Sequence, residues 1–492
     1  MQTLEPADFA TDFDLTGEPS RRVFIKGLGF VSAALLMGSL GGCDKLAEAI
    51  RNRPVRRRLR TGSPEVDASI DLYRQAVAAM KALPATDPRS WTAQAQIHGT
   101  VAGGFNFCEH GTDHFFDWHR AYLLYFERIC QKLTNHPKFA LPYWNWNQDP
   151  DVHPAFLDSA SPLFLGRNRT SVAGFGVTTT ATLDPIFADT NFFTFRPQVE
   201  GTPHNSVHSI IGATMGTGGS ALDPLFWTHH CMVDYCWYKW NVDLGNDNTN
   251  DATWINHVNS HFVDANGNPV TATAGITTLM PLISYQYESS AIGSSAAAAA
   301  FSTRTAYQKV EKRIRAGANI RFDIKQRVHL ADRVAVSIAK PLSLETRLTP
   351  EAFSQIIGSD SARERVFASI EYAQLPATSD FSVRVFVNLP SAHSRTPGED
   401  PHYAGSFAFF GTEAPEVAAA AGQHRHQPRF LVNLTDTIQR LRAAQELGPG
   451  TPVSLQLVPT PFAGKFEKED TELVLNAIDI ITTPVLVASA PR

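Results

Sequence analysis

The stretch CEHGTDHFFDWHRAYLLYFERIC, residues 108–130, places three histidines close together and ends in an amphipathic run. Apolar residues recur there at helical spacing from Phe115 to Ile129, which predicts a helix. Farther along the chain, PHNSVHSIIG (203–212) and DPLFWTHHCMVD (223–234) each carry two more histidines on expected helices. Whether these imidazoles share one site decides both the fold and the function.

Composition excludes some classes of function. The chain has 492 residues and a formal net charge of −5, with 43% hydrophobic and 18% charged residues. These values are ordinary for a globular protein, and no basic face argues for a nucleic-acid partner. The length corresponds to about three domains. The five cysteines are odd in number and irregularly spaced, so we do not expect a disulfide framework.

The N-terminus has the pattern of an export signal. Arg21 and Arg22 precede a short apolar run, which predicts a twin-arginine signal over residues 1–43. The run ends in LGGC, which is similar to a lipobox with Cys43 as the lipidated residue, although cleavage without a lipid fits the pattern equally well. We therefore expect export by the twin-arginine route to the periplasm. The protein would be either a membrane-anchored lipoprotein, attached only through Cys43, or a secreted protein.

Composition also predicts the domain boundaries. Residues 44–65 contain the basic run RNRPVRRRLR and are expected to form a solvated linker at a membrane surface. Residues 66–288 have helical periodicity interrupted by long loops, and 289–325 are rich in Ala and Ser, as in a linker. Residues 326–485 form an expected β-sandwich. Its six predicted strands are 334–339, 366–373, 381–389, 430–434, 453–458 and 473–481.

The histidine spacings favour a metal site. His204 and His208 are four residues apart, so on a helix they lie on one face and can share a metal. Only one of the adjacent His229 and His230 can point at the same centre, because neighbours on a helix diverge by about 100°. No HExxH or CxxC motif is present, and two sets of three imidazoles fit copper with dioxygen best. A structural zinc or iron bundle remains an alternative.

These segments resemble the two copper regions of tyrosinases, catechol oxidases and molluscan haemocyanins. CEHGTDHFFDWHRAYLLYFE is similar to the first region, and PHNSVH with DPLFWTHHCMVD is similar to the second. The resemblance implies a mainly α fold, a four-helix bundle with a di-copper centre and long loops, followed by a C-terminal all-β sandwich. It implies two copper ions as cofactors. The first would be held by His98, His110 and His119, and the second by His204, His208 and His230.

The resemblance extends to plant polyphenol oxidases. DATWINHVNSHFVDANGNPV, ISYQYE, ERVFASIEYAQLPATSDFSVRVFVNLPSA and HYAGSFAFFG are similar to their middle and C-terminal segments. This implies a bacterial polyphenol oxidase of plant-like architecture, which oxidises o-diphenols to o-quinones with O2 and also hydroxylates monophenols. Its partners would be small phenols and O2, and a copper chaperone could deliver the metal. The alternative is an O2 carrier of the haemocyanin type, which would show little turnover.

The same resemblance assigns further roles around the metals. Cys108 stands where some relatives form a thioether bond to the histidine ligand, here His110. Glu200 and Asn205 match a pair that holds a water near the second copper and helps to deprotonate a phenol. Thr217 stands where plant enzymes place a bulky entrance residue, which implies a wider entrance.

Three further expectations concern departures from the family pattern and the C-terminal domain. His114 replaces a bulky apolar residue, and we expect it to form hydrogen bonds or face the surface rather than bind metal. Tyr235 replaces the arginine that usually follows Asp234, which puts the usual ion pair there in doubt. The sandwich could shield the site in a latent enzyme, with the loop SAHSRTPGEDPHYAG (391–405) as the candidate for the shielding segment.

Overall fold

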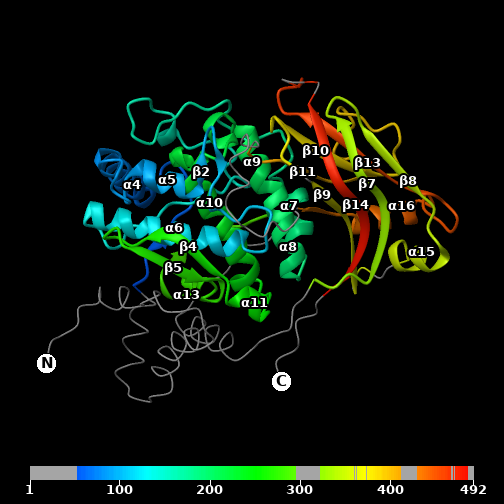
Figure 1. Cartoon of the computed structure of the whole chain (residues 1–492), viewed down its shortest axis with the longest axis horizontal. Helices are drawn as coiled ribbons and strands as arrows, with labels where there is room; N and C mark the ends of the chain where they lie inside the picture. Colours follow the sequence, from blue (N-terminus) through cyan, green and yellow to red (C-terminus); the bar gives the residue numbers. More distant parts are fainter. Residues whose placement is uncertain are drawn as a thin grey trace, which may run out of the picture. The chain divides into compact units, whose positions relative to one another are not determined.

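The structure of the protein is a computed structural model. It describes residues 52–294 and 322–485, apart from 359–360, 362, 373, 412–428, 467–468 and 470. The predicted signal, Cys43 and part of the predicted linker 289–325 lie outside the described residues. The described chain forms two compact units (Figure 1). Among the described residues, the first unit contains 52–97, 116–165 and 222–294, and the second contains 98–115, 166–221 and those from 322 onward.

The first unit is mainly helical. Its two longest helices are amphipathic. The first of them begins after Ser63 with Pro64, whose backbone angle suits the first helical position. The helices are α4 (Pro64–Ala82), α5 (Trp91–His98), α6 (Phe115–Thr134), α10 (Pro224–Tyr238), α11 (Ala252–Ile255), α12 (Ala274–Thr277) and α13 (Met280–Ile283). Short strands accompany them: β1 (Val55–Arg56) pairs in parallel with β6 (Gln286–Tyr287), and β4 (Val258–Val263) pairs with β5 (Pro269–Thr273).

The basic run before α4 belongs to this core, so its prediction as a solvated linker is wrong. The Arg56 side chain is completely buried. It forms ion pairs with Glu127 at 2.7 Å and with Asp234 at 2.8 Å. Asp234 also pairs with Arg120 at 2.5 Å. Two arginines from elsewhere in the chain therefore pair with Asp234, at the place where Tyr235 put the usual ion pair in doubt. Burial opposes the charge on Asp234, but the two arginines lower its pKa overall.

The second unit combines a kinked helical segment with a β-sandwich. Its helices are α7 (Thr180–Phe187), α8 (Phe192–Val199), the helical turn η2 (Glu200–His204), α9 (Asn205–Ile211), α15 (Pro350–Ile356) and α16 (Thr435–Ala443). A small hairpin joins β2 (Gly99–Thr100) to β3 (Gly104–Phe105). The larger strands are β7 (Gln326–Ser337), β8 (Leu342–Thr346), β9 (Glu364–Tyr372), β10 (Phe381–Val387), β11 (Tyr403–Ala408), β12 (Arg429–Asn433), β13 (Val453–Pro461) and β14 (Glu472–Pro484).

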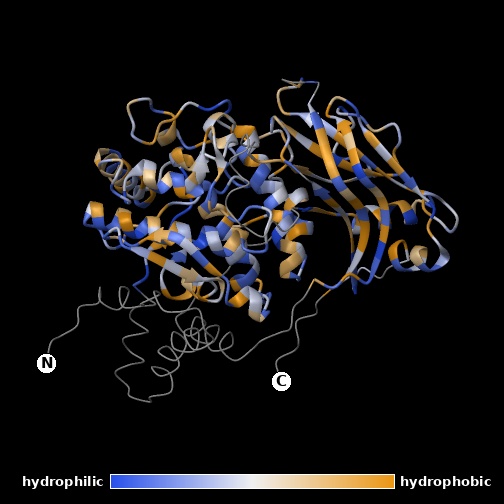
Figure 2. Cartoon of the chain, viewed as in Figure 1, coloured by the Kyte–Doolittle hydropathy of each residue, from blue (hydrophilic) through white to orange (hydrophobic). Residues whose placement is uncertain are grey.

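The sandwich consists of two antiparallel sheets of four strands. The strand orders are β11-β10-β13-β8 and β12-β9-β14-β7. Hydrophobic and hydrophilic residues alternate along strands such as β7 and β14 (Figure 2), as expected when one face of a sheet is buried. One hydrophobic core takes residues from both sheets, for example Ile370, Val385 and Ile480. All six predicted strands are present, whereas β8 and β11 were not predicted from the alternation pattern.

The predicted fold class, a helical core followed by an all-β sandwich, is confirmed. Within the described residues, none of the helices has both the length and the apolar character that a membrane span requires.

Candidate metal centre

The six histidines predicted as ligands come from four parts of the chain. His98 is the last residue of α5, and His110 lies in the loop before α6, which carries His119. The second set lies on the kinked segment and on α10: His204 ends η2, His208 lies in α9 and His230 lies in α10. Five of the side chains are buried, and His110 is partly buried. The kink at Thr202, whose backbone is extended, lets a new helical segment begin just before His204.

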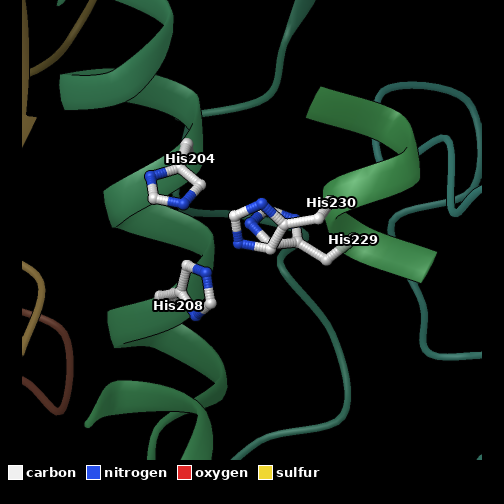
Figure 3. A group of neighbouring side chains, drawn as sticks. All are labelled: His204, His208, His229 and His230. Carbon is white, nitrogen blue, oxygen red and sulfur yellow. The ribbon is translucent and has the colours of Figure 1, made fainter. Parts of the chain in front are cut away.

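These histidines gather into groups that could hold metal. In each group, ligand atoms of all the side chains lie within 4.8 Å of one another. The groups are His204, His208, His229 and His230 (Figure 3); His98, His119 and His230; and His98, Cys108 and His110. All six predicted ligands therefore belong to at least one group, and shared members link the groups.

Direct contacts within the second unit connect the two predicted ligand sets. The Nε2 atoms of His98 and His110 lie 3.0 Å apart. The ring of His110 stacks on that of His204, with the centroids 5.3 Å apart. The rings of His204 and His208 follow at 4.7 Å, from the same side of one helical segment (Figure 3). The imidazoles thus form one continuous cluster.

Hydrogen bonds fix the protonation of three of these rings. In each ring Nδ1 faces an oxygen that accepts a hydrogen bond, so Nδ1 carries a proton, and in the neutral ring Nε2 keeps its lone pair. The three acceptors are the Gly218 carbonyl for His98, the Met215 carbonyl for His208 and the Asn205 side-chain oxygen for His204, each at 2.8 Å. Burial lowers the pKa of His98 to about 4 and that of His204 to about 3, which keeps both rings neutral at pH 7.

This donor set fits copper. Neutral, buried imidazoles with Nε2 directed into the cluster are ligands that copper accepts readily, and the second hydrogen bond of each ring holds the ligand in orientation. Among the described residues, every group that could hold a metal is built from histidines, with Cys108 as the one member of another kind. Hard cations such as Mg²⁺ or Ca²⁺ prefer oxygen ligands and do not fit.

Glu200 is held firmly beside the first ligand set. Its Oε2 forms an ion pair with Arg196 at 2.5 Å, and its Oε1 accepts a hydrogen bond from the Gly111 amide at 2.6 Å. Oε1 also lies 3.6 Å from Nδ1 of His110. The other arm of Arg196 reaches Asp113 at 3.1 Å. Burial raises the pKa of Glu200 despite the neighbouring guanidinium. The carboxylate thereby connects η2 with the loop that carries His110.

Asn205 contacts the sandwich as well as its ligand neighbour. While its oxygen accepts from His204, its amide nitrogen donates to the Ala408 carbonyl at 2.8 Å. One turn farther along α9, Ser209 donates to the Phe409 carbonyl at 2.7 Å. The end of β11 is therefore tied to the helix that carries His204 and His208.

An aromatic side chain from the sandwich covers the histidine cluster. The ring of Phe410 stacks on that of His208, with centroids 3.8 Å apart and an interplanar angle of 17°. It also lies 5.1 Å from Phe105, which in turn stacks on His110 at 4.6 Å. Phe410 thus holds the position over His208, and it lies five residues beyond the loop 391–405 that was the candidate for this role.

The structure also places four further residues that were considered in the sequence, namely Cys108, Thr217, His114 and His229. Cys108 donates to the His98 carbonyl at 3.3 Å, and burial raises the pKa of its thiol. Thr217 is half-buried, and its hydroxyl donates to the Thr214 carbonyl at 2.9 Å. His114 is partly buried at the start of α6, outside the metal groups, whereas His229 belongs to the same group as His230.

Four residues of the site were not predicted from the sequence. Phe410 and Arg196 have no local signature, because neither the abundance of phenylalanine nor a single arginine marks a contact with a distant segment. Met215 and Gly218 act through their backbone carbonyls. The glycines of GTGG (216–219) were the available signal for a close backbone approach.

Comparisons with known proteins identify tyrosinases and a chloroplastic hydroxylase as relatives of this chain. The family model described as the common central domain of tyrosinase matches residues 88–182 and 158–243. Tyrosinase HcTyr1 of Hahella sp. (strain CCB-MM4) is 25% identical over 83% of this chain and 95% of its own length. The chloroplastic (+)-larreatricin hydroxylase of Larrea tridentata is 30% identical, over 46% of this chain and 48% of its own length.

Solved structures share the fold of the chain. A latent apple tyrosinase superposes with a TM-score of 0.60 at 21% identity, covering 87% of this chain and 97% of that one. A functional unit of octopus haemocyanin superposes with a TM-score of 0.54 at 16% identity, covering 88% of this chain and all of that one. At these identities the likeness concerns the fold.

Proposed function

Because the chain belongs to the tyrosinase and polyphenol oxidase family of two-copper proteins, we propose that it oxidises o-diphenols to o-quinones with O2. In this reaction two catechols and one O2 give two o-quinones and two waters. The observation that carries the proposal is the cluster of six histidines, five of them buried, in groups linked by shared members. His98, His110 and His119 would hold one copper, and His204, His208 and His230 the other. When present, the copper pair would bind O2 and accept the electrons of the phenol.

The residues of the chain bind and orient the phenol. The face of the His208 ring covered by Phe410 is a flat surface of the right size for a phenol ring. Glu200 lies in η2 and Asn205 directly follows it. We propose that the Glu200 carboxylate receives the proton of an incoming phenol through a water that Asn205 helps to hold. This proton transfer would extend the activity to o-hydroxylation of monophenols. The small side chain of Thr217 would leave the entrance wide enough for bulky phenols.

We further propose that the described form is latent. Phe410 occupies the place of the substrate ring, and three hydrogen bonds hold the strand that carries it. Thr202, Asn205 and Ser209 donate to the carbonyls of Ser406, Ala408 and Phe409 at 2.9, 2.8 and 2.7 Å. A phenol must therefore displace a packed aromatic ring before it reaches His208.

Turnover of catechol by the full-length, copper-loaded chain tests the function and the latency together. Burial of the Phe410 ring contributes about 1.5–3 kcal/mol, which a phenol must overcome to displace it. Phe410→Ala removes this barrier and should raise the rate of quinone formation about 10- to 100-fold. Phe164→Ala removes an exposed ring in the first unit and should leave the rate unchanged. If both variants hold two coppers and neither forms quinone, the chain is an O2 carrier and the proposed activity is wrong.

Two remaining proposals concern maturation. We propose a thioether bond between Cys108 and His110, which would lock the ring of a ligand that the structure shows to be less buried than the others. We also propose export by the twin-arginine route to the periplasm, with Cys43 either lipidated or removed with the signal. Forming the thioether is an oxidation that removes two hydrogens, with O2 as the oxidant. Mass spectrometry of the mature protein tests both proposals, because the mass falls by two hydrogens in the first case and rises by the mass of a lipid in the second.

A further inference from the structure

One short loop contacts a histidine from each predicted ligand set. The loop between α9 and α10 presents the Met215 carbonyl to Nδ1 of His208 and the Gly218 carbonyl to Nδ1 of His98, both at 2.8 Å. A carbonyl can only accept, so the same loop fixes the tautomer of both rings. Two ligands that are 110 residues apart in the sequence, His98 and His208, are therefore oriented by carbonyls only three residues apart.

The loop can take this position because its backbone touches the backbone of the β2–β3 hairpin. A Cβ on Gly218 would lie 2.3 Å from the carbonyl carbon of Gly104, and one on Gly219 would lie 2.6 Å from the amide nitrogen of Val101. A Cβ on Gly99 would lie 2.3 Å from the Gly104 oxygen and 2.6 Å from the Gly218 oxygen. Backbone atoms cannot rotate away as a flexible side chain can, so glycine is required on both surfaces.

We propose that this glycine contact, formed by Gly99, Gly104, Gly218 and Gly219, is a positioning element that couples the two copper sites. A metal on Nε2 of His208 strengthens the hydrogen bond to Met215 and orders the loop. The ordered loop then presents the Gly218 carbonyl to His98, so filling one site favours filling the other. The proposal rests on the proposed copper function, and it assigns to the loop a role in metal loading rather than in the oxidation itself.

Copper titration of the full-length apoprotein tests the proposal. In Gly218→Ala the loop must retreat by about 1 Å to reach ordinary contact, which stretches the bond to His98 beyond hydrogen-bonding distance. Loss of such an orienting partner costs about 10- to 100-fold in metal affinity. We expect Gly218→Ala to bind one copper as tightly as the wild type and the other about 10- to 100-fold more weakly, in a competition assay with a Cu(I) chelator. Gly166→Ala is the matched control, because open space surrounds that glycine.

Hydrogen exchange of the wild-type chain provides a test without a substitution, in case Gly218→Ala does not fold. We expect residues 99–105 and 212–219 to become protected together, at the same copper equivalents. The proposal is overturned if the two segments respond at different equivalents, or if a folded Gly218→Ala binds both coppers like the wild type. A wild-type chain that loads two coppers with this coupling but does not oxidise catechol overturns the proposed activity alone. A wild-type chain that binds no copper overturns both.

Discussion

Replacing Arg56 tests whether the N-terminal basic run is part of the folded core. The guanidinium is fully buried, pairs with Glu127 and Asp234, and lies 3.6 Å from the centre of the Tyr285 ring. In Arg56→Met, Asp234 keeps Arg120, but Glu127 loses its ion-pair partner in a buried position and keeps the amide of Leu141. Removing one partner of a buried ion pair costs about 3–5 kcal/mol, and we expect unfolding of the first unit to become easier by that amount.

A comparison with Arg58 separates the effect of burial from the effect of losing a charge. Arg58 pairs with Asp149 at 2.6 Å, but both side chains are about one-quarter to one-third exposed, so Arg58→Met should cost only about 0–1 kcal/mol. The double variant Arg56→Met/Glu127→Leu removes both buried charges and should recover much of the loss. All eight tryptophans lie in the first unit, so their fluorescence during denaturation by guanidinium reports on that unit. The reasoning is refuted if Arg56→Met costs no more than Arg58→Met.

Three further predictions concern the site and the sandwich. Arg196→Met leaves the Glu200 carboxylate buried without its ion pair; we expect weaker copper retention and a lower melting temperature, and a copper content equal to that of the wild type would contradict this. In Cys108→Ser the mass difference of two hydrogens between the observed and calculated chain should disappear, and a wild-type mass with no such difference rules out the thioether. The hydrogen bond to Asp479, opposed by slight burial, raises the pKa of His329 in the folded chain. This contribution to stability is therefore present below the unfolded pKa of about 6.5 and is lost as the pH rises through the folded pKa. Because the ring is about half exposed, the effect should stay below about 1 kcal/mol, and His329→Gln should flatten the pH dependence of sandwich melting; an unchanged pH profile would contradict this origin.

The parts of the fold that could be predicted from the sequence depend on local spacing. His204 and His208 lie on one face because of their spacing on a helix, and the six predicted strands follow from alternation. Two strands were missed. β11 includes Gly405, so alternation is weak there, whereas β8 alternates over only five residues. Family resemblance supplied the copper ligands, which the residues alone left open between several metals.

The predictions that were wrong or missing concern contacts between segments far apart in the sequence. A run of arginines has the composition of a solvated linker, and nothing local shows that Glu127 and Asp234, 71 and 178 residues away from Arg56, lie next to it. The same limit applies to Phe410, which no nearby pattern distinguishes from the other phenylalanines. Both cases show that burial of an unusual residue depends on where its partners are, and the sequence gives that information only through known relatives.

The position of β11 has a consequence for solubility once the enzyme is active. This strand lies at the edge of its sheet, and the outward carbonyls of Ser406 and Ala408 are satisfied by side chains of the ligand-bearing helix. If Phe410 left His208 together with β11, the Ser406 and Ala408 carbonyls would lose their donors, and the edge of the strand would be open to other molecules. If the proposed latency holds, activated preparations should therefore dimerise or precipitate more readily as concentration rises.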